Sequence, residues 1–181
     1  MRQKLGKCYP PYLELISLLL LVLAFYLAWS NYSALPETIP THFNGHGVPD
    51  DWGSKNMIFL FPALSAFIFI LLTSLCIWCA ATDDPLKLIN LPLKWKANLT
   101  AEQAEELRIF IIRCLFAMKL IIQGLAAYGI YITIEITCER AAGLGTAWFL
   151  FIAAIVALAG FILWKAFRMS RSARPGQKLR H

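Results

Sequence analysis

The chain has 181 residues, of which 59% are hydrophobic and 15% charged, and its formal net charge is +6. Soluble domains average about 45–50% apolar and about 25% charged residues, so this composition excludes an ordinary soluble globule. The apolar residues come in long runs, which excludes a disordered or nucleic-acid-binding tail and is typical of a membrane protein. Five cysteines at irregular spacings indicate no disulfide framework.

Four segments are long and apolar enough to cross a membrane, since about 20 helical residues span a hydrocarbon core of about 30 Å. We expect the spans at residues 12–30, 57–81, 109–134 and 146–167. The predicted fold class is therefore all-α: an integral membrane bundle of four transmembrane helices, with a structured extracytoplasmic loop between helices 1 and 2. A cleaved signal peptide is the alternative for the first segment, but its apolar stretch exceeds the usual limit of about 15 residues.

The predicted organisation has four regions. Residues 1–81 hold the first span, an external loop at 31–56 and the second span; residues 82–108 form a cytoplasmic interfacial loop; residues 109–167 form a second transmembrane hairpin; and residues 168–181 form a basic cytoplasmic tail. Within the interfacial loop, Thr100 occupies a helix N-cap position and Gln103 its capping-box position, which predicts a helix start near Ala101.

The distribution of Lys and Arg predicts how the chain crosses the membrane. These residues concentrate in the N-terminal tail, in the 82–108 segment and in the C-terminal tail, whereas the loops on the other side contain only Lys55 and Arg140. Because positively charged loops stay on the cytoplasmic side, we expect a multi-pass protein of the inner (cytoplasmic) membrane with both termini in the cytoplasm. The lipid bilayer is its first expected partner, and no nucleic acid is expected.

The first external loop reads LPETIPTHFNGHGVPDDWGSK from Leu35 to Lys55. Its prolines and glycines exclude a long helix, and its closely spaced apolar residues favour an ordered, folded loop. The loop strongly resembles a bacterial and archaeal membrane domain of unknown function, the one that forms the N-terminal part of SdpI-type immunity proteins. The resemblance rests on the LP and IP pairs and on His42, Phe43, Asn44, Gly47, Pro49, Asp50, Trp52 and Lys55, and it covers about a third of the chain.

The resemblance implies a function for this loop. SdpI-type proteins protect a producing cell from a secreted peptide toxin and can also signal by holding a repressor at the membrane. By analogy, the segment from His42 to Lys55 would recognise an external peptide or small ligand, and the effect would pass down the first two helices to the cytoplasmic tail. The chain lacks the Arg- and Pro-bearing pattern of the second domain of those longer proteins, so the immunity role rests on analogy alone.

The same loop offers candidate metal ligands. His42, His46 and Asp50 or Asp51 carry the imidazole and carboxylate groups that bind zinc or another divalent metal, and three such ligands plus water would leave a catalytic position open. The glycines around His46 argue against a helix that would align both imidazoles. In the other interpretations, these side chains hold the shape of the loop or form an exposed recognition surface. No other cofactor is expected.

Charged residues inside a span cost about 2.5–3.5 kcal/mol at its centre and are therefore candidates for function. Glu14 and Arg113 lie near the starts of two parallel spans and could form an ion pair, unless Arg113 extends to the headgroups. Lys119, with Gln123 one turn further, could face the core and bind an anionic group or line a polar path. The alternative for Lys119 is a side chain that reaches the cytoplasmic surface.

We favour a non-enzymatic function, in which a small membrane protein senses an external ligand through its first loop. One alternative is a metal-dependent, membrane-embedded enzyme that uses His42 and Asp50. The other is an accessory subunit of a transporter or channel, with Lys119 and Gln123 facing a partner or pore. The partners to consider in the membrane are another membrane protein or further copies in a homo-oligomer.

Overall fold

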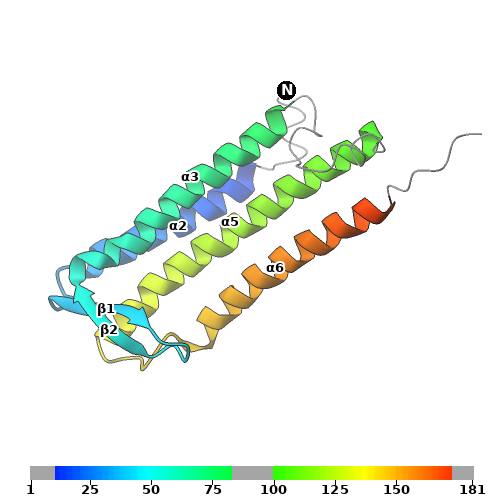
Figure 1. Cartoon of the computed structure of the whole chain (residues 1–181). Coiled ribbons are helices and arrows are strands. Elements are labelled where there is room, and N and C mark those ends of the chain that lie inside the picture. Colours follow the sequence, from blue (N-terminus) through cyan, green and yellow to red (C-terminus); the bar gives the residue numbers. More distant parts are fainter. Residues whose placement is uncertain (1–10, 83–99, 173–181) are drawn as a thin grey trace, which may run out of the picture.

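The computed structural model describes residues 11–82 and 100–172. Its elements in chain order are α2 (Pro11–Asn31), β1 (Thr38–Phe43), β2 (Pro49–Ser54), the 3-10 helix η1 (Lys55–Phe59), α3 (Leu60–Ala81), α5 (Ala101–Thr137) and α6 (Gly145–Ser172). Figure 1 shows the long helices side by side, with both strands at one end of the bundle, hereafter the hairpin end. The other end is called the opposite end.

Four helices in the described ranges are long and apolar enough to cross a membrane, as the sequence predicts. The apolar segments run over Glu14–Asn31, Lys55–Ala81, Ala101–Thr137 and Gly145–Lys165. Many of their large side chains point outward, among them Leu19 and Val22 of α2 and Leu150 and Val156 of α6. Lipid tails can cover such faces, so their exposure is that of a multi-pass membrane protein.

Helix α5 is the central element of the bundle. It contacts α2, α3 and α6, and Figure 1 shows it between α6 on one side and the α2–α3 pair on the other. Its buried stripe contains Ile112, Lys119, Gln123, Ala126, Ile130 and Ile134. These positions recur at helical spacing, so their side chains share one face, which is turned toward α2 and α3.

The start of α5 confirms the predicted capping box. The Thr100 hydroxyl accepts a hydrogen bond from the Gln103 amide N–H at 3.2 Å, and the Gln103 side chain accepts one from the Thr100 amide at 3.0 Å. Two of the otherwise unpaired N–H groups at the helix start are thereby satisfied. Most of the predicted interfacial loop, residues 83–99, lies outside the described residues.

The all-α prediction is wrong in one respect, because the ordered loop is a two-stranded antiparallel sheet. Thr38 pairs with Ser54, Pro40 with Trp52 and Phe43 with Pro49, with irregularities around His42. Proline gives up a ladder hydrogen bond, but both strands of a two-stranded sheet are edges, so Pro40 and Pro49 are tolerated. Proline also holds the residue before it in extended geometry, which suits a strand.

Candidate functional site

The base of the hairpin is fixed to the helices. Leu35 and Ile39 are buried in an apolar cluster with Ala28, Ile58 and Ile130. A polar clamp closes the same region: Lys55 Nζ donates to Glu37 Oε1 at 2.9 Å, and the Lys55 amide donates to the Glu37 carbonyl at 2.9 Å. Lys55, one of the residues of the sequence pattern, thus joins the beginning and the end of the hairpin.

The turn at the tip of the hairpin is built by Asn44. Its Oδ1 accepts hydrogen bonds from the amides of His46 at 2.9 Å and Val48 at 3.2 Å. Its backbone carbonyl accepts from the Gly47 amide at 2.8 Å. Gly47 has φ +75°, a left-handed conformation that favours glycine. Asn44 and Gly47 therefore determine the shape of the loop.

The tip docks on the segment that joins α5 to α6. The Leu144 amide donates to the Gly47 carbonyl at 2.8 Å, and the Tyr128 hydroxyl donates to the Leu144 carbonyl at 2.8 Å. A Cβ at Gly143 would lie 2.6 Å from Gly47 O, closer than real Cβ atoms come. Glycine is thus required on both sides, and the contact links the α2–hairpin–α3 half of the chain to the α5–α6 half.

A local ion pair supports the same segment. The Glu135 carboxylate, at the end of α5, accepts hydrogen bonds from Arg140 Nη2 at 2.7 Å and Nε at 3.0 Å. These hydrogen bonds raise the pKa of the Arg140 guanidinium above its ordinary value. Between them, Glu139 has φ +60°, a conformation that non-glycine residues rarely adopt.

The outward side of the hairpin carries the side chains with the most varied chemistry. His42 Nδ1 lies 2.5 Å from Asp50 Oδ1, although the two side chains are 68% and 41% exposed. Trp52, on the same strand as Asp50, is 57% exposed. We call His42, Asp50 and Trp52 the exposed triad. It offers an imidazole, a carboxylate and an indole to solvent, whereas Phe43 and Pro49 are half-buried and face each other across the sheet.

The three-ligand metal site expected at His42, His46 and Asp50 is not assembled. No group of three or more His, Cys, Asp or Glu side chains that could hold a metal occurs in residues 11–82 and 100–172. His46 lies in the turn after Asn44, three residues beyond the end of β1, while the pairing of His42 with Asp50 runs across the strands. The hairpin therefore brings together two of the candidate metal ligands, His42 and Asp50, and leaves His46 apart from them.

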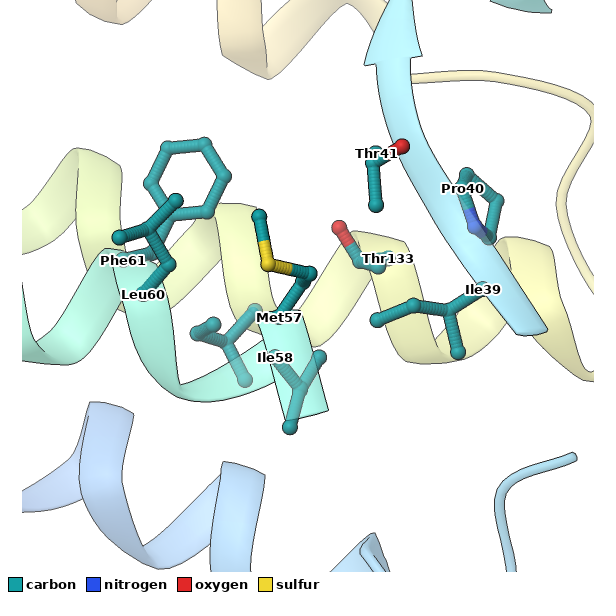
Figure 2. Close-up of a pocket in the computed structure, with 9 residues that line it drawn as sticks. Ile39, Pro40, Thr41, Met57, Ile58, Leu60, Phe61 and Thr133 are labelled. Atoms are coloured by element: carbon teal, nitrogen blue, oxygen red, sulfur yellow. The ribbon is translucent and has the colours of Figure 1, made fainter. Parts of the chain in front are cut away.

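A cavity of about 40 Å³ lies beneath the hairpin. Figure 2 shows its walls: Ile39 and Thr41 of β1, Met57 of η1, Phe61 of α3 and Thr133 of α5. Ligand pockets usually measure about 300–1,000 Å³, so this cavity is too small for a drug-sized molecule.

A second group of polar residues lies within the bundle. Lys119 of α5 is fully buried, and its ammonium forms an ion pair with the Glu14 carboxylate of α2. Lys119 Nζ also donates to Thr73 Oγ1 of α3 at 3.0 Å. The rings of Phe69 and Phe116 lie 5.1 and 5.5 Å from the same nitrogen, as cation–π partners. Lys119 thus connects three helices.

One turn toward the hairpin end, Gln123 is also fully buried, and its Nε2 donates to the Ser65 carbonyl of α3 at 3.0 Å. The prediction that Lys119 extends to the surface is therefore wrong, and its core-facing alternative is confirmed. Both side chains point at helices of their own chain, so they are not free to face a partner protein or a pore.

The hypothesis that Glu14 pairs with Arg113 is wrong, because Lys119 takes that place and Arg113 is exposed. The reason is the helical phase: six residues turn the helix by about 600°, so Arg113 lies about 120° away from the buried stripe that contains Lys119. The helical Cα–Cβ bond also tilts toward the N-terminus, which directs the Lys119 side chain toward the level of Glu14.

Comparison with known proteins gives a partial assignment. Residues 18–66 match a family described as "Domain of unknown function (DUF1648)", a range that contains most of α2, the hairpin and the first turns of α3. An uncharacterized protein of Archaeoglobus fulgidus is 35% identical over 63 residues, which are 33% of this chain and 34% of that protein. The chain thus matches about a third of the length of this relative. No solved structure matches the chain. The expected resemblance to a domain of unknown function is confirmed to this extent.

Proposed function

We propose that this protein is a receptor-like module of the inner membrane, in the manner of an SdpI-type immunity or signalling protein, and that it recognises an external peptide or small ligand through the exposed triad. The observation behind this function is that the residues of the loop pattern fall into two groups, one that shapes the hairpin and one that is exposed. Asn44, Gly47 and Lys55 are occupied in shaping and fixing the hairpin, whereas His42, Asp50 and Trp52 are left exposed.

The chemistry of the triad fits a peptide ligand. An exposed indole offers a large apolar contact with a polar edge, and aromatic side chains of this kind are enriched at the energetic centres of interfaces. The neighbouring imidazole and carboxylate can hydrogen-bond to backbone amides or pair with a charged side chain. The rigid attachment of the hairpin reduces the conformational entropy that binding would cost.

The contact at the hairpin tip supports a route for the signal. Because Gly47 binds the backbone of Leu144, a ligand that shifts the hairpin would also act on α5 and α6. This route differs from the path down the first two helices that the sequence suggests, and it leads toward the basic tail at the C-terminal end of α6.

Recognition of an external ligand requires that the hairpin end faces outward. Cys138, at the end of α5, is exposed, while Cys76, Cys79 and Cys114 are buried. In a Cys8→Ser background, a membrane-impermeant maleimide added to intact cells should label Cys138, and a Cys138→Ser variant serves as the control. Labelling only after the cells are opened would place the hairpin in the cytoplasm and contradict the proposal.

Recognition is then tested by protection. A sensitive bacterium that expresses the full chain is challenged with a panel of purified secreted peptide toxins, and survival is compared with that of cells carrying His42→Ala/Asp50→Asn/Trp52→Ala. We expect the wild type to protect against at least one toxin and the triple variant to fail at equal membrane abundance. Ser33→Ala, an exposed position before the hairpin, is the matched control. Full protection by the triple variant would exclude the triad as the recognition surface.

A further inference from the structure

Three buried polar atoms in the bundle have no hydrogen-bond partner among the described residues. They are Glu14 Oε2, Ser17 Oγ and Gln123 Oε1. Ser17 and Gln123 are both fully buried, and the side chain of Glu14 is 20% exposed. An unpaired polar atom in an apolar interior costs about 1–3 kcal/mol, so three such atoms in one region call for a ligand that hydrogen-bonds to them.

The three atoms lie in one part of the bundle. Ser17 follows Glu14 by three residues on α2, and Gln123 follows Lys119 by four on α5, so each pair shares a helix face. Helices α2 and α5 both run toward the hairpin end, as Figure 1 shows, and the Glu14–Lys119 ion pair sets them at the same level. Ser17 and Gln123 therefore both lie one turn beyond that ion pair.

The charges of the site determine which ligand it can hold. Glu14 and Lys119 neutralise each other, and an added cation or anion would bring an uncompensated charge into an apolar interior. The ligand must also donate hydrogen bonds, since the carboxylate and amide oxygens can only accept them. A water molecule is neutral and donates two hydrogen bonds, so it meets both requirements.

We propose that Glu14 Oε2, Ser17 Oγ and Gln123 Oε1 bind internal water, which forms a hydrated polar site next to the Lys119–Glu14 ion pair. Water enters past Glu14, whose partly exposed side chain lies in the first turn of α2. Toward the hairpin end the site is closed by apolar side chains, among them Ala24, Ala28 and Ile130, all fully buried. The site is therefore hydrated from one end only.

Radiolytic hydroxyl footprinting of the full chain in lipid nanodiscs tests this proposal, because X-ray pulses oxidise side chains next to bound water. Phe69 and Phe116, which flank Lys119, should be oxidised at least about threefold faster than Phe151, which packs against Gly124 and Tyr128. Ser17→Ala should reduce the oxidation of Phe69 and Phe116 by about half. Equal rates for the three rings, or no change in the variant, would overturn the proposal.

The sign of a stability change gives an independent test. If Ser17 binds water, Ser17→Ala loses a hydrogen bond and lowers the midpoint of unfolding in sodium dodecyl sulfate. If its hydroxyl is unpaired, the same change removes a desolvation penalty and raises the midpoint. Ser65→Ala is the matched control, because the Ser65 hydroxyl is buried but donates to the Pro62 carbonyl of its own helix at 3.1 Å. This control should leave the oxidation of Phe69 and Phe116 at the wild-type rate, and a raised midpoint for Ser17→Ala would overturn the proposal.

Discussion

The backbone of Gly47 in the hairpin binds the backbone of Leu144 in the α5–α6 turn, through a hydrogen bond of 2.8 Å between carbonyl and amide. The two residues are almost a hundred positions apart in the sequence, and their contact closes the hairpin end of the bundle. The adjoining Gly143 allows the two chains to approach so closely, because any side chain there would meet the Gly47 carbonyl.

Gly143→Ala should separate the hairpin tip from the α5–α6 turn. The added methyl carbon would lie 2.6 Å from a backbone oxygen, which cannot move without distorting the turn. We expect a loss of about 1–3 kcal/mol of stability, measured by thermal or detergent-induced unfolding. Gly45→Ala is the control, since a Cβ there meets nothing within 4 Å, and it should change stability by less than about 0.5 kcal/mol. Equal effects of the two variants would speak against the docking contact.

The Glu14–Lys119 ion pair should show strong energetic coupling. Lys119→Met leaves the Glu14 carboxylate without its buried counter-charge, so we expect a cost of about 3 kcal/mol. In a double-mutant cycle with Glu14→Gln, the coupling energy should reach at least about 1 kcal/mol. Arg113→Met, at an exposed position of the same helix, should change stability by less than about 0.5 kcal/mol. Additive effects of the two substitutions would show that the ion pair is not formed in the membrane.

His42→Ala and Asp50→Asn should leave the hairpin folded. Ion pairs between exposed side chains contribute about 0–1 kcal/mol, and these two side chains are 68% and 41% exposed. Each variant should therefore unfold within about 1 kcal/mol of the wild type in a thermal melt. If both variants are this stable, a loss of protection in variants at these positions is caused by lost recognition and not by unfolding. A much larger loss of stability in either variant would instead give the pair a structural role.

Glu139→Gly should stabilise the protein. Glu139 has φ +60°, and left-handed geometry costs a non-glycine residue about 1–2 kcal/mol, which glycine avoids. We expect a gain of about 1 kcal/mol in the free energy of unfolding. Glu139→Ala removes the same charge but keeps the backbone strain, so it should match the wild type. A comparable gain from both variants would attribute the effect to the charge.

The sequence predicts those parts of the structure that depend on local signals. Long apolar runs identify the four helices, and the spacing of Thr100 and Gln103 identifies where α5 begins. The closely spaced apolar and turn-forming residues of the first loop likewise predict an ordered segment. The two strands were not predicted because both contain proline, which argues against a strand unless that strand is at the edge of a sheet. The sequence does not show which strands are edges.

Local sequence signals do not predict contacts between segments that are distant in the chain. Choosing Lys119 over Arg113 as the partner of Glu14 requires the rotation and axial offset of two helices that are about a hundred residues apart. The docking of Gly47 on Leu144 likewise leaves no local pattern, although the glycines on either side of Leu144 are compatible with a close approach. Tyr128, which binds the Leu144 carbonyl, had no feature to distinguish it from other aromatic residues of its span.

The length of α5 gives the molecule a mechanical property. Its 37 residues make a continuous rod of about 55 Å, nearly twice the thickness of a hydrocarbon core of about 30 Å. A tilt of about 5° at one end of such a rod displaces the other end by about 5 Å. The hairpin is attached where α5 ends, and Glu102 and Glu105 lie in its first two turns at the far end. A tilt of α5 about its hairpin end would therefore displace Glu102 and Glu105 more than any residue of α5 near the hairpin.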